Sequence, residues 1–182
     1  MEKELLNSTL NALLFAANKH KFDKTKSDEP YINHLLKVCC LLCNVGGIND
    51  PAILIAAALH DILEKTTTKA EEIRKQFGDE VCNIVLELTE KQYLSDDGKL
   101  IRQLQTVNQL SPKAQIIKLA DKIASSQAII LNPPNGWDIR KRMAYLESTE
   151  KIIELLHGTN EPLGNYFYNF LSEEKAVMEY SL

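Results

Sequence analysis

A histidine and an aspartate stand side by side at the end of an apolar segment. Residues 51–59, PAILIAAAL, carry no charge, and His60, Asp61 and Glu64 follow closely. A helix that is apolar on every side is typical of the middle of a domain. A carboxylate in such surroundings costs several kcal/mol or changes its pKa, unless it is paired or binds a metal. The dipeptide is therefore either a buried ion pair or part of a metal site.

Two further side chains would complete a metal site with the dipeptide. His34 and Asp121 each lie on the apolar stripe of a segment with helical periodicity, so both are expected to face inward. Two imidazoles and two carboxylates suit a borderline divalent ion such as Mn²⁺, Fe²⁺ or Zn²⁺. Such an ion lowers the pKa of a bound water, and Glu64, one turn after the dipeptide, could orient that water.

The same residues also admit plainer roles. An inward histidine such as His34 is more often a hydrogen-bonded core residue than a ligand. Asp121 could form a salt bridge with Lys118 or Lys122 of its own segment. These alternatives stay open on the spacing alone.

Almost every segment of the chain has helical periodicity. Helices are predicted over 2–19, 30–45, 51–64, 69–76, 79–90, 99–109, 113–131, 137–157 and 161–178. Proline near several starts and glycine after several ends support these boundaries. No segment reads as a strand or a repeat. We therefore expect an all-α domain, a bundle of roughly eight or nine helices around one core.

Length and composition narrow the class of protein. The 182 residues predict one domain, 1–182, with 45% hydrophobic and 25% charged residues. The net charge of -4 gives no global basic field for binding nucleic acid. No apolar run approaches the roughly 20 residues that span a bilayer, and no signal segment follows Met1. We expect a cytoplasmic enzyme or binding protein that interacts with neither membranes nor nucleic acid.

The remaining potential metal ligands have simpler interpretations. Cys39, Cys40 and Cys43 lie within one and a half helical turns, where adjacent positions point about 100° apart and thiolates converge poorly. Structural packing is the favoured role for them, and the cysteine usage suits a reducing compartment. His20 and His157 lie near predicted helix ends, where a helix-terminus or surface role is expected.

The order of these residues resembles the HD superfamily of metal-dependent phosphohydrolases. The words YINH (31–34), ALHD (58–61), FG (77–78) and KLADK (118–122) are similar to the hydrolase domain of RelA/SpoT-type proteins, and most of all to the stand-alone small alarmone hydrolases of the animal SpoT type. The similarity covers most of the chain. It implies removal of the 3′-diphosphate of (p)ppGpp as pyrophosphate. It also implies one Mn²⁺ bound by His34, His60, Asp61 and Asp121.

The sequence departs from the family at positions linked to catalysis and substrate binding. The family pattern HDxxED is here completed by Glu64 and Lys65, so an ammonium replaces a carboxylate. The loop before YINH is short and offers Lys24 and Lys26 but no arginine. An asparagine expected four residues after the last metal aspartate is Ser125. The metal ligands are therefore intact, while the substrate pocket is altered.

Two more residues match positions that contact the nucleotide in the family. Lys141 and Tyr145 lie one turn apart, although a solvent-facing lysine and a half-buried tyrosine are equally good interpretations. Lys65 could itself bind a phosphate as a point charge. Three functions are therefore considered: a (p)ppGpp hydrolase, an HD protein that binds a nucleotide without turnover, and an HD hydrolase of another phosphorylated nucleotide. The sequence does not set the oligomeric state.

Overall fold

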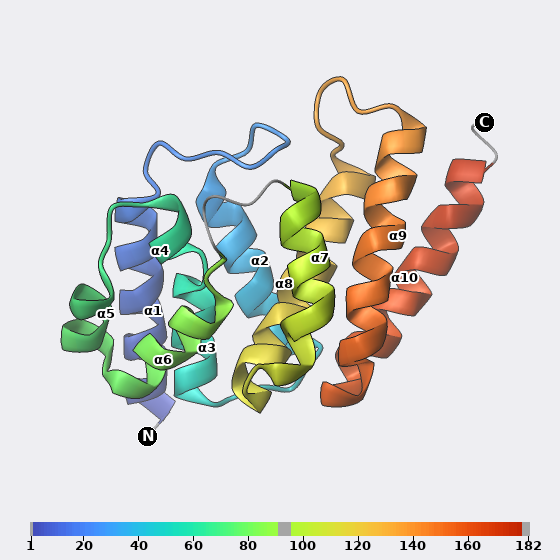
Figure 1. Ribbon diagram of the computed structural model, residues 1–182. Helices are drawn as coiled ribbons and strands as arrows, with labels where there is room; N and C mark the ends of the chain where they lie inside the picture. The colour runs from blue at the N-terminus through green and yellow to red at the C-terminus, as the bar shows by residue number, and fades with distance from the viewer. Residues whose placement is uncertain (1, 91–95, 180–182) are drawn as a thin grey trace.

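The computed structural model describes residues 2–90 and 96–179 as α-helices joined by short loops (Figure 1). Its helices are α1 (Glu2–Lys19), α2 (Tyr31–Asn44), α3 (Pro51–Leu59), α4 (Ile62–Lys65), α5 (Ala70–Phe77), α6 (Asp79–Leu88), α7 (Asp96–Thr106), α8 (Pro112–Leu131), α9 (Ile139–Leu156) and α10 (Glu161–Glu179), with 3₁₀ turns at Val107–Gln109 and His157–Thr159. Within these residues there is no strand, only an isolated bridge between Lys24 and Pro30. The predicted all-α class is confirmed.

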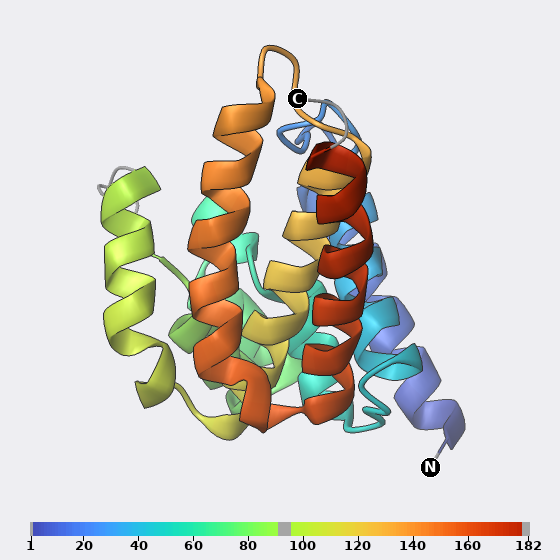
Figure 2. The same cartoon turned by 90° about the vertical axis from the view of Figure 1, so that its right-hand side faces the viewer.

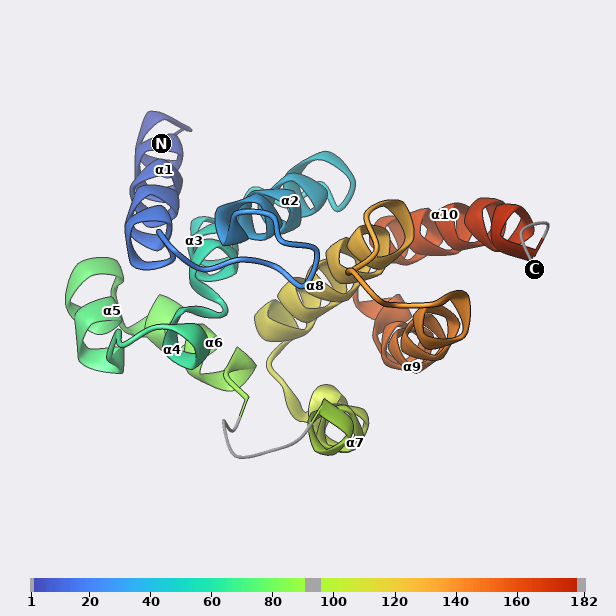
Figure 3. The same cartoon turned by 90° about the horizontal axis from the view of Figure 1, so that it is seen from above.

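The central helix of the first half is α3. Asp50 accepts a hydrogen bond from the Ala52 amide at 2.8 Å, and Pro51 occupies the first helical position, where a missing N–H costs nothing. Every residue from Ala52 to Leu59 is buried, because α1, α2, α6 and α8 pack around this helix (Figure 3). The prediction of a helix that is apolar on all sides is confirmed.

The helix predicted over 51–64 is interrupted, which is a correction. It ends at Leu59, and α4 begins only after the His60-Asp61 dipeptide. Asp61 has φ -103° and ψ 0°, in the sparsely allowed bridge region. The His60 ring turns back to the Ala57 carbonyl, and the Asp61 carboxylate reaches Tyr31 of α2. These contacts hold the dipeptide between two helices, so nine predicted helices become ten in the described part of the chain.

Other boundaries move by only one to three residues. Pro30 precedes α2 with an extended ψ of 130°, so it lies before the helix and not in its first turn. The seventh helix begins at Asp96, three residues before the predicted start, and Ser95 of the expected loop lies outside the described residues. Asp138 caps α9 by accepting from the Lys141 amide at 2.8 Å, which delays the start from Trp137 to Ile139.

The second half of the molecule packs around α8. This helix contacts α2 and α3 on one side and α9 and α10 on the other. Figure 2 shows α8, α9 and α10 side by side, with α7 standing next to α9. Seen from above, α1 and α10 lie at opposite ends of the molecule (Figure 3). No helix among the described residues is both long enough and apolar enough to cross a membrane.

Gly164, in the first turns of α10, lies close to the imidazole of His157. A Cβ added there would lie 2.3 Å from Cδ2 of His157, whose Nε2 is 3.2 Å from Oδ1 of Asn165. We expect Gly164→Ala to lower the free energy of unfolding by about 1–3 kcal/mol, because the imidazole must move. Chemical denaturation monitored by circular dichroism measures this loss.

Gly158→Ala is the matched control, since nothing lies within 4 Å of a Cβ added at that position. The double variant His157→Ala/Gly164→Ala removes the obstructing ring and should recover most of the lost stability. A Gly164→Ala protein as stable as the wild type would contradict the close approach of α10 to His157.

Candidate metal centre

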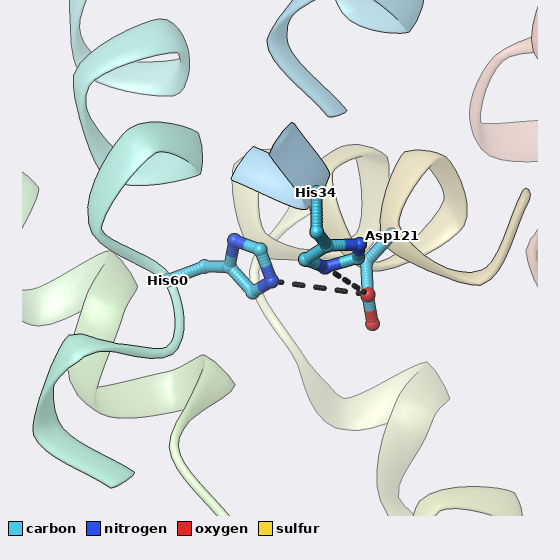
Figure 4. A group of neighbouring side chains, drawn as sticks. All are labelled: His34, His60 and Asp121. Atoms are coloured by element: carbon cyan, nitrogen blue, oxygen red, sulfur yellow. Dashed lines mark ion pairs between the residues drawn. The ribbon is translucent and has the colours of Figure 1, made fainter. Parts of the chain in front are cut away.

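Three side chains from separate helices meet at the end of α3. They are His34 of α2, His60 after α3 and Asp121 of α8 (Figure 4). One ligand atom from each lies within 4.8 Å of the others. Asp121 Oδ1 is 3.3 Å from His34 Nε2 and 3.8 Å from His60 Nε2. This spacing suits atoms that surround one cation.

The orientation of His60 is that of a metal ligand. Its Nδ1 lies 2.8 Å from the Ala57 carbonyl, which only accepts, so Nδ1 carries the proton and Nε2 the lone pair. This Nε2 faces the cluster, is buried and has no hydrogen-bond partner. Buried polar atoms are almost always satisfied, and metal-bound histidines commonly donate their other nitrogen to a backbone carbonyl. The residues therefore fit a divalent ion.

Asp61 adjoins this cluster. Its Oδ2 is 3.5 Å from His60 Nε2 and accepts a hydrogen bond from the Tyr31 hydroxyl. Burial has the largest single effect and raises the pKa of Asp61, as does the charge of Asp121. His60, Lys65 and His34 together nevertheless leave this pKa below its usual range. The carboxylate therefore stays charged, and the Tyr31 hydrogen bond fixes its direction.

The pKa values of the other two acid-base groups reflect their mutual contact. Burial raises the pKa of Asp121, but Lys122 and His34 hold it well below its usual range. Burial lowers the pKa of His34. Its hydrogen bond to Asp121 and the charges of Asp121 and Asp61 together outweigh burial, so the pKa is raised above its usual value. The plainer salt bridge between Asp121 and Lys122 is present at 3.8 Å, alongside the cluster and not in place of it.

Glu64 points toward α7. It accepts hydrogen bonds from Lys99 Nζ at 2.5 Å and from the Glu90 amide at 3.3 Å. Lys65 contacts a different helix, α2, where its Nζ lies 5.0 Å from the ring centroid of Tyr31. Its charge also lowers the pKa of Asp61. Position 65, where the family pattern has an aspartate, therefore carries a positive charge near Asp61, and the carboxylate of Glu64 is bound to Lys99.

Cations and aromatic rings gather on the adjacent surface, which we call the aromatic patch: Lys26, Trp137, Lys141 and Tyr145. The two rings are 5.8 Å apart, and Lys141 Nζ is 4.6 Å from the Trp137 centroid. Lys26 Nζ is 5.5 Å from Trp137 and 5.7 Å from Tyr145. The rings meet edge to face at an interplanar angle of 62°, and partly exposed rings with flanking ammonium groups suit a base and its phosphates.

The aromatic patch adjoins the metal cluster through Tyr145 and Ser125. Burial raises the pKa of Tyr145, as does the charge of Asp121, while a hydrogen bond with Ser125 lowers it. Ser125 Oγ is in turn 3.4 Å from Asp121 Oδ1. Lys24 is different, because its ammonium pairs with Asp28 at 2.7 Å and both groups are exposed.

Trp137 was missed by the sequence interpretation. It is the only tryptophan of the chain and follows a Pro-Pro-Asn-Gly loop, a signal that could have drawn attention to it. Its partner loop is brought close by two contacts of Asn132, whose carbonyl accepts from Ser27 and whose amide donates to Glu29 at 2.6 Å. The hydrophobic periodicity of the sequence does not show which distant loops contact each other.

Two further expectations need correction. A surface role for His20 is wrong: it is 3% exposed, its ring lies 5.0 Å from that of Tyr31, and its Nδ1 is 2.8 Å from Asp23 Oδ2. Packing is correct for Cys39 but wrong for Cys40 and Cys43, which are exposed. Adjacent helical positions point in different directions, so only one of these three thiols faces the core. In the described part of the chain, no cysteine lies in the metal-binding cluster.

Comparisons with known proteins agree with this geometry. The HD domain model matches residues 12–142. The chain is 39% identical to the guanosine-3′,5′-bis(diphosphate) 3′-pyrophosphohydrolase MESH1 of Xenopus tropicalis over 92% of this chain and 96% of that protein. For human MESH1 the identity is 35%, over 85% of this chain and 87% of the relative.

A solved structure extends the similarity to three dimensions. It is a metazoan ortholog of SpoT that hydrolyses ppGpp, and it superposes with a TM-score of 0.86 at 32% identity, covering 91% of this chain and 94% of its own. The order of helices, the residues gathered at the end of α3 and the extent of these matches agree. The chain therefore belongs to the HD-domain family, among the proteins related to MESH1 and SpoT.

Proposed function

We propose that this protein is a metal-dependent phosphohydrolase that removes the 3′-diphosphate of (p)ppGpp as pyrophosphate. The observation that carries the proposal is the buried, unpartnered Nε2 of His60, held beside the carboxylate of Asp121 and the ring of His34. The names of the MESH1 relatives, which match nearly the whole chain, support the substrate.

One divalent ion would be held by His34, His60, Asp61 and Asp121. We propose Mn²⁺, because two imidazoles and two carboxylates suit a borderline ion that also tolerates oxygen ligands. When bound, it would polarise a phosphoryl oxygen and lower the pKa of a water molecule. A single ion is consistent with the cluster, because His20 contacts Asp23 and the ring of Tyr31 and is not among the three residues that meet there.

The substrate would lie across the aromatic patch. The rings of Trp137 and Tyr145 offer a surface for the guanine base, and the ammonium groups of Lys26 and Lys141 would contact phosphates. The Ser125 hydroxyl, next to Asp121, would contact the sugar. Lys24 belongs to the proposed set through its sequence position, although Asp28 engages its ammonium.

The proposed chemistry is an attack of water on the 3′ phosphorus. A P–O bond to the water oxygen forms, the P–O3′ bond breaks, and the 3′ oxygen takes up a proton. Glu64 would accept the proton from water. Its carboxylate is hydrogen-bonded to the Lys99 ammonium, so this bond would have to break first. Lys65 would stabilise negative charge on the phosphates as a point charge.

A second function has a specific observation in its favour. Lys65 stands where the family has a carboxylate, and Glu64 is engaged by Lys99. Both features weaken acid-base catalysis, so the protein would then bind a phosphorylated nucleotide without turnover. The third function is hydrolysis of another phosphorylated nucleotide. The positive charge of Lys65 would stabilise the negative charge of that substrate's phosphate near the cluster.

One screen distinguishes these functions. The Mn²⁺-loaded protein is incubated with (p)ppGpp, NADPH and a panel of nucleotides, while pyrophosphate and phosphate release are measured. Pyrophosphate release from (p)ppGpp above all other substrates supports the proposal. Binding of (p)ppGpp by calorimetry without release favours the second function, and turnover of another compound favours the third.

Removal of the metal is expected to destabilise the fold, because the ion would bridge α2, α8 and the end of α3 only in the native state. At a free ion concentration about 100 times the dissociation constant, binding contributes about 2.7 kcal/mol. For a chain of this size that corresponds to a melting temperature about 5–10 °C higher. Differential scanning calorimetry before and after EDTA, with metal content measured on each sample, tests this. An unchanged melting temperature after proven metal loss would contradict it.

The cellular compartment follows from the same set of proposals. All four cysteines are free thiols, and two of them, Cys40 and Cys43, are exposed. Exposed thiols persist where thioredoxin and glutathione keep proteins reduced. We therefore propose that the protein acts in the cytoplasm.

A further inference from the structure

His20 is a buried histidine that is not part of the metal cluster. Its side chain, just after the end of α1, is fully covered by the protein. Its Nδ1 lies 2.8 Å from Asp23 Oδ2, and because a carboxylate only accepts, Nδ1 carries the proton. Its Nε2 is buried and has no hydrogen-bond partner among the described residues. A buried ring with one unsatisfied nitrogen costs more than an apolar ring would, so packing alone does not explain this histidine.

The imidazole of His20 lies against the ring of Tyr31. The two ring centroids are 5.0 Å apart, and the ring planes are inclined by 33°. Rings at this distance attract each other, so each limits the positions that the other can take. Tyr31 is 7% exposed, and its hydroxyl donates a hydrogen bond to the carboxylate of Asp61. His20 therefore contacts the residue that orients Asp61.

Main-chain hydrogen bonds also hold His20 and Tyr31 next to each other, across the loop that joins α1 to α2 (Figure 1). The His20 amide donates to the Ala16 carbonyl at 2.8 Å, and the His20 carbonyl accepts from the Asp23 amide at 2.9 Å. The Asp23 carbonyl in turn accepts from the Tyr31 amide at 2.9 Å. Asp23 thus binds His20 through its side chain and Tyr31 through its main chain.

We propose that His20 is a positioning residue for the metal centre: held by Asp23, its imidazole keeps the Tyr31 hydroxyl on the carboxylate of Asp61. The inference rests on the proposed function and adds to its metal centre a residue that is not a ligand. A carboxylate released by Tyr31 could turn toward Lys65, whose positive charge lowers the pKa of Asp61. Partners that orient ligands in this way typically contribute about 10–100-fold to metal affinity or activity.

The affinity for Mn²⁺, measured by isothermal titration calorimetry on the full chain, tests this role. His20→Ala should weaken binding by at least about tenfold, and Tyr31→Phe, which removes the hydroxyl, should do the same. The double variant should bind no more weakly than Tyr31→Phe alone, because His20 acts through that hydroxyl. Two factors that multiply in the double variant would show that His20 acts by another route and would overturn the proposal.

Asp23 and Leu171 supply the matched variants. Asp23→Ala removes the acceptor for His20 Nδ1 and should weaken Mn²⁺ binding, whereas Asp23→Asn keeps an accepting oxygen and should restore most of the affinity. Leu171→Ala truncates a buried side chain of α10, at the opposite end of the molecule from α1 (Figure 3). It should lower the melting temperature without changing the affinity. A Leu171→Ala protein that loses as much affinity as His20→Ala would reduce the effect of His20 to general destabilisation.

Exchange of the Tyr31 hydroxyl proton with solvent is a readout that needs neither metal nor substrate. It is followed by NMR in the metal-free protein, through the deuterium isotope effect on the labelled tyrosine Cζ, and Tyr31→Phe identifies the signal. His20→Ala should speed this exchange by at least about tenfold, because the hydrogen bond to Asp61 opens more often. Unchanged exchange would overturn the role of His20 even in a protein that binds Mn²⁺ and hydrolyses (p)ppGpp. Faster exchange in a protein that binds no Mn²⁺ would contradict the proposed function and still support the hold of His20 on Tyr31.

Discussion

Replacing His60 by alanine is expected to abolish divalent-metal binding and to lower (p)ppGpp hydrolysis by about a thousandfold. The imidazole is 4% exposed, and its Nε2 is the one atom of the cluster that is buried without any hydrogen-bond partner in the described part of the chain. Without it, Asp61 and Asp121 lose the group that lies between their carboxylates. Stabilisation of transition-state charge by a metal amounts to about 4 kcal/mol, which is about a thousandfold in rate.

Two measurements check this expectation. Metal content per chain is determined by plasma mass spectrometry after Mn²⁺ loading and gel filtration, and kcat/KM is determined with (p)ppGpp. His157→Ala is the matched control, because this histidine lies after α9 and contacts Asn165 and Tyr168 instead of the cluster. It should keep its metal. A His60→Ala protein that retains one ion per chain would show that the ligand set is different.

Helices and inward-facing residues could be predicted because both depend on local periodicity. The stripes that contain His34 and Asp121 repeat every three to four residues, so their direction follows from neighbours in the same helix. The prolines that mark the starts of two helices are each preceded by a capping residue, Asp50 or Ser111, which accepts a hydrogen bond from the amide of Ala52 or Ala114. Cluster members could therefore be named before their distances were known.

Features that depend on distant contacts could not be predicted in this way. The break after Leu59 arises because the His60 ring bonds to a carbonyl and Asp61 bonds to another helix. The pairing of Glu64 with Lys99 joins residues 35 positions apart. The aromatic patch depends on two loops that meet through Asn132. In each case the partner is set by the packing of helices and not by the adjacent sequence.

The position of Lys65 has the second large expected effect. Lys65→Asp should raise (p)ppGpp hydrolysis by at least about tenfold, because a positioned acid-base group typically contributes about 10²–10⁴-fold in rate. Glu64 is hydrogen-bonded to Lys99, so its carboxylate does not replace the acid-base group that is missing at position 65. Lys65→Asp replaces the ammonium beside Tyr31 by a carboxylate, which makes the surroundings of Asp61 more negative. The variant should therefore bind the metal at least as tightly as the wild type does.

An opposing effect makes this test informative. Lys65 supplies positive charge where a phosphate develops negative charge, and that would favour catalysis on a different ester. Lys65→Met separates the two effects, because it removes the ammonium without adding a carboxylate. If the missing acid limits the rate, only Lys65→Asp gains activity. If the ammonium serves another substrate, both variants lose that turnover and neither gains activity on (p)ppGpp. Lys69→Asp, at an exposed position before α5, controls for the change in net charge. A wild type that hydrolyses (p)ppGpp rapidly, with Lys65→Asp unchanged, would show that this departure from the family does not limit the reaction.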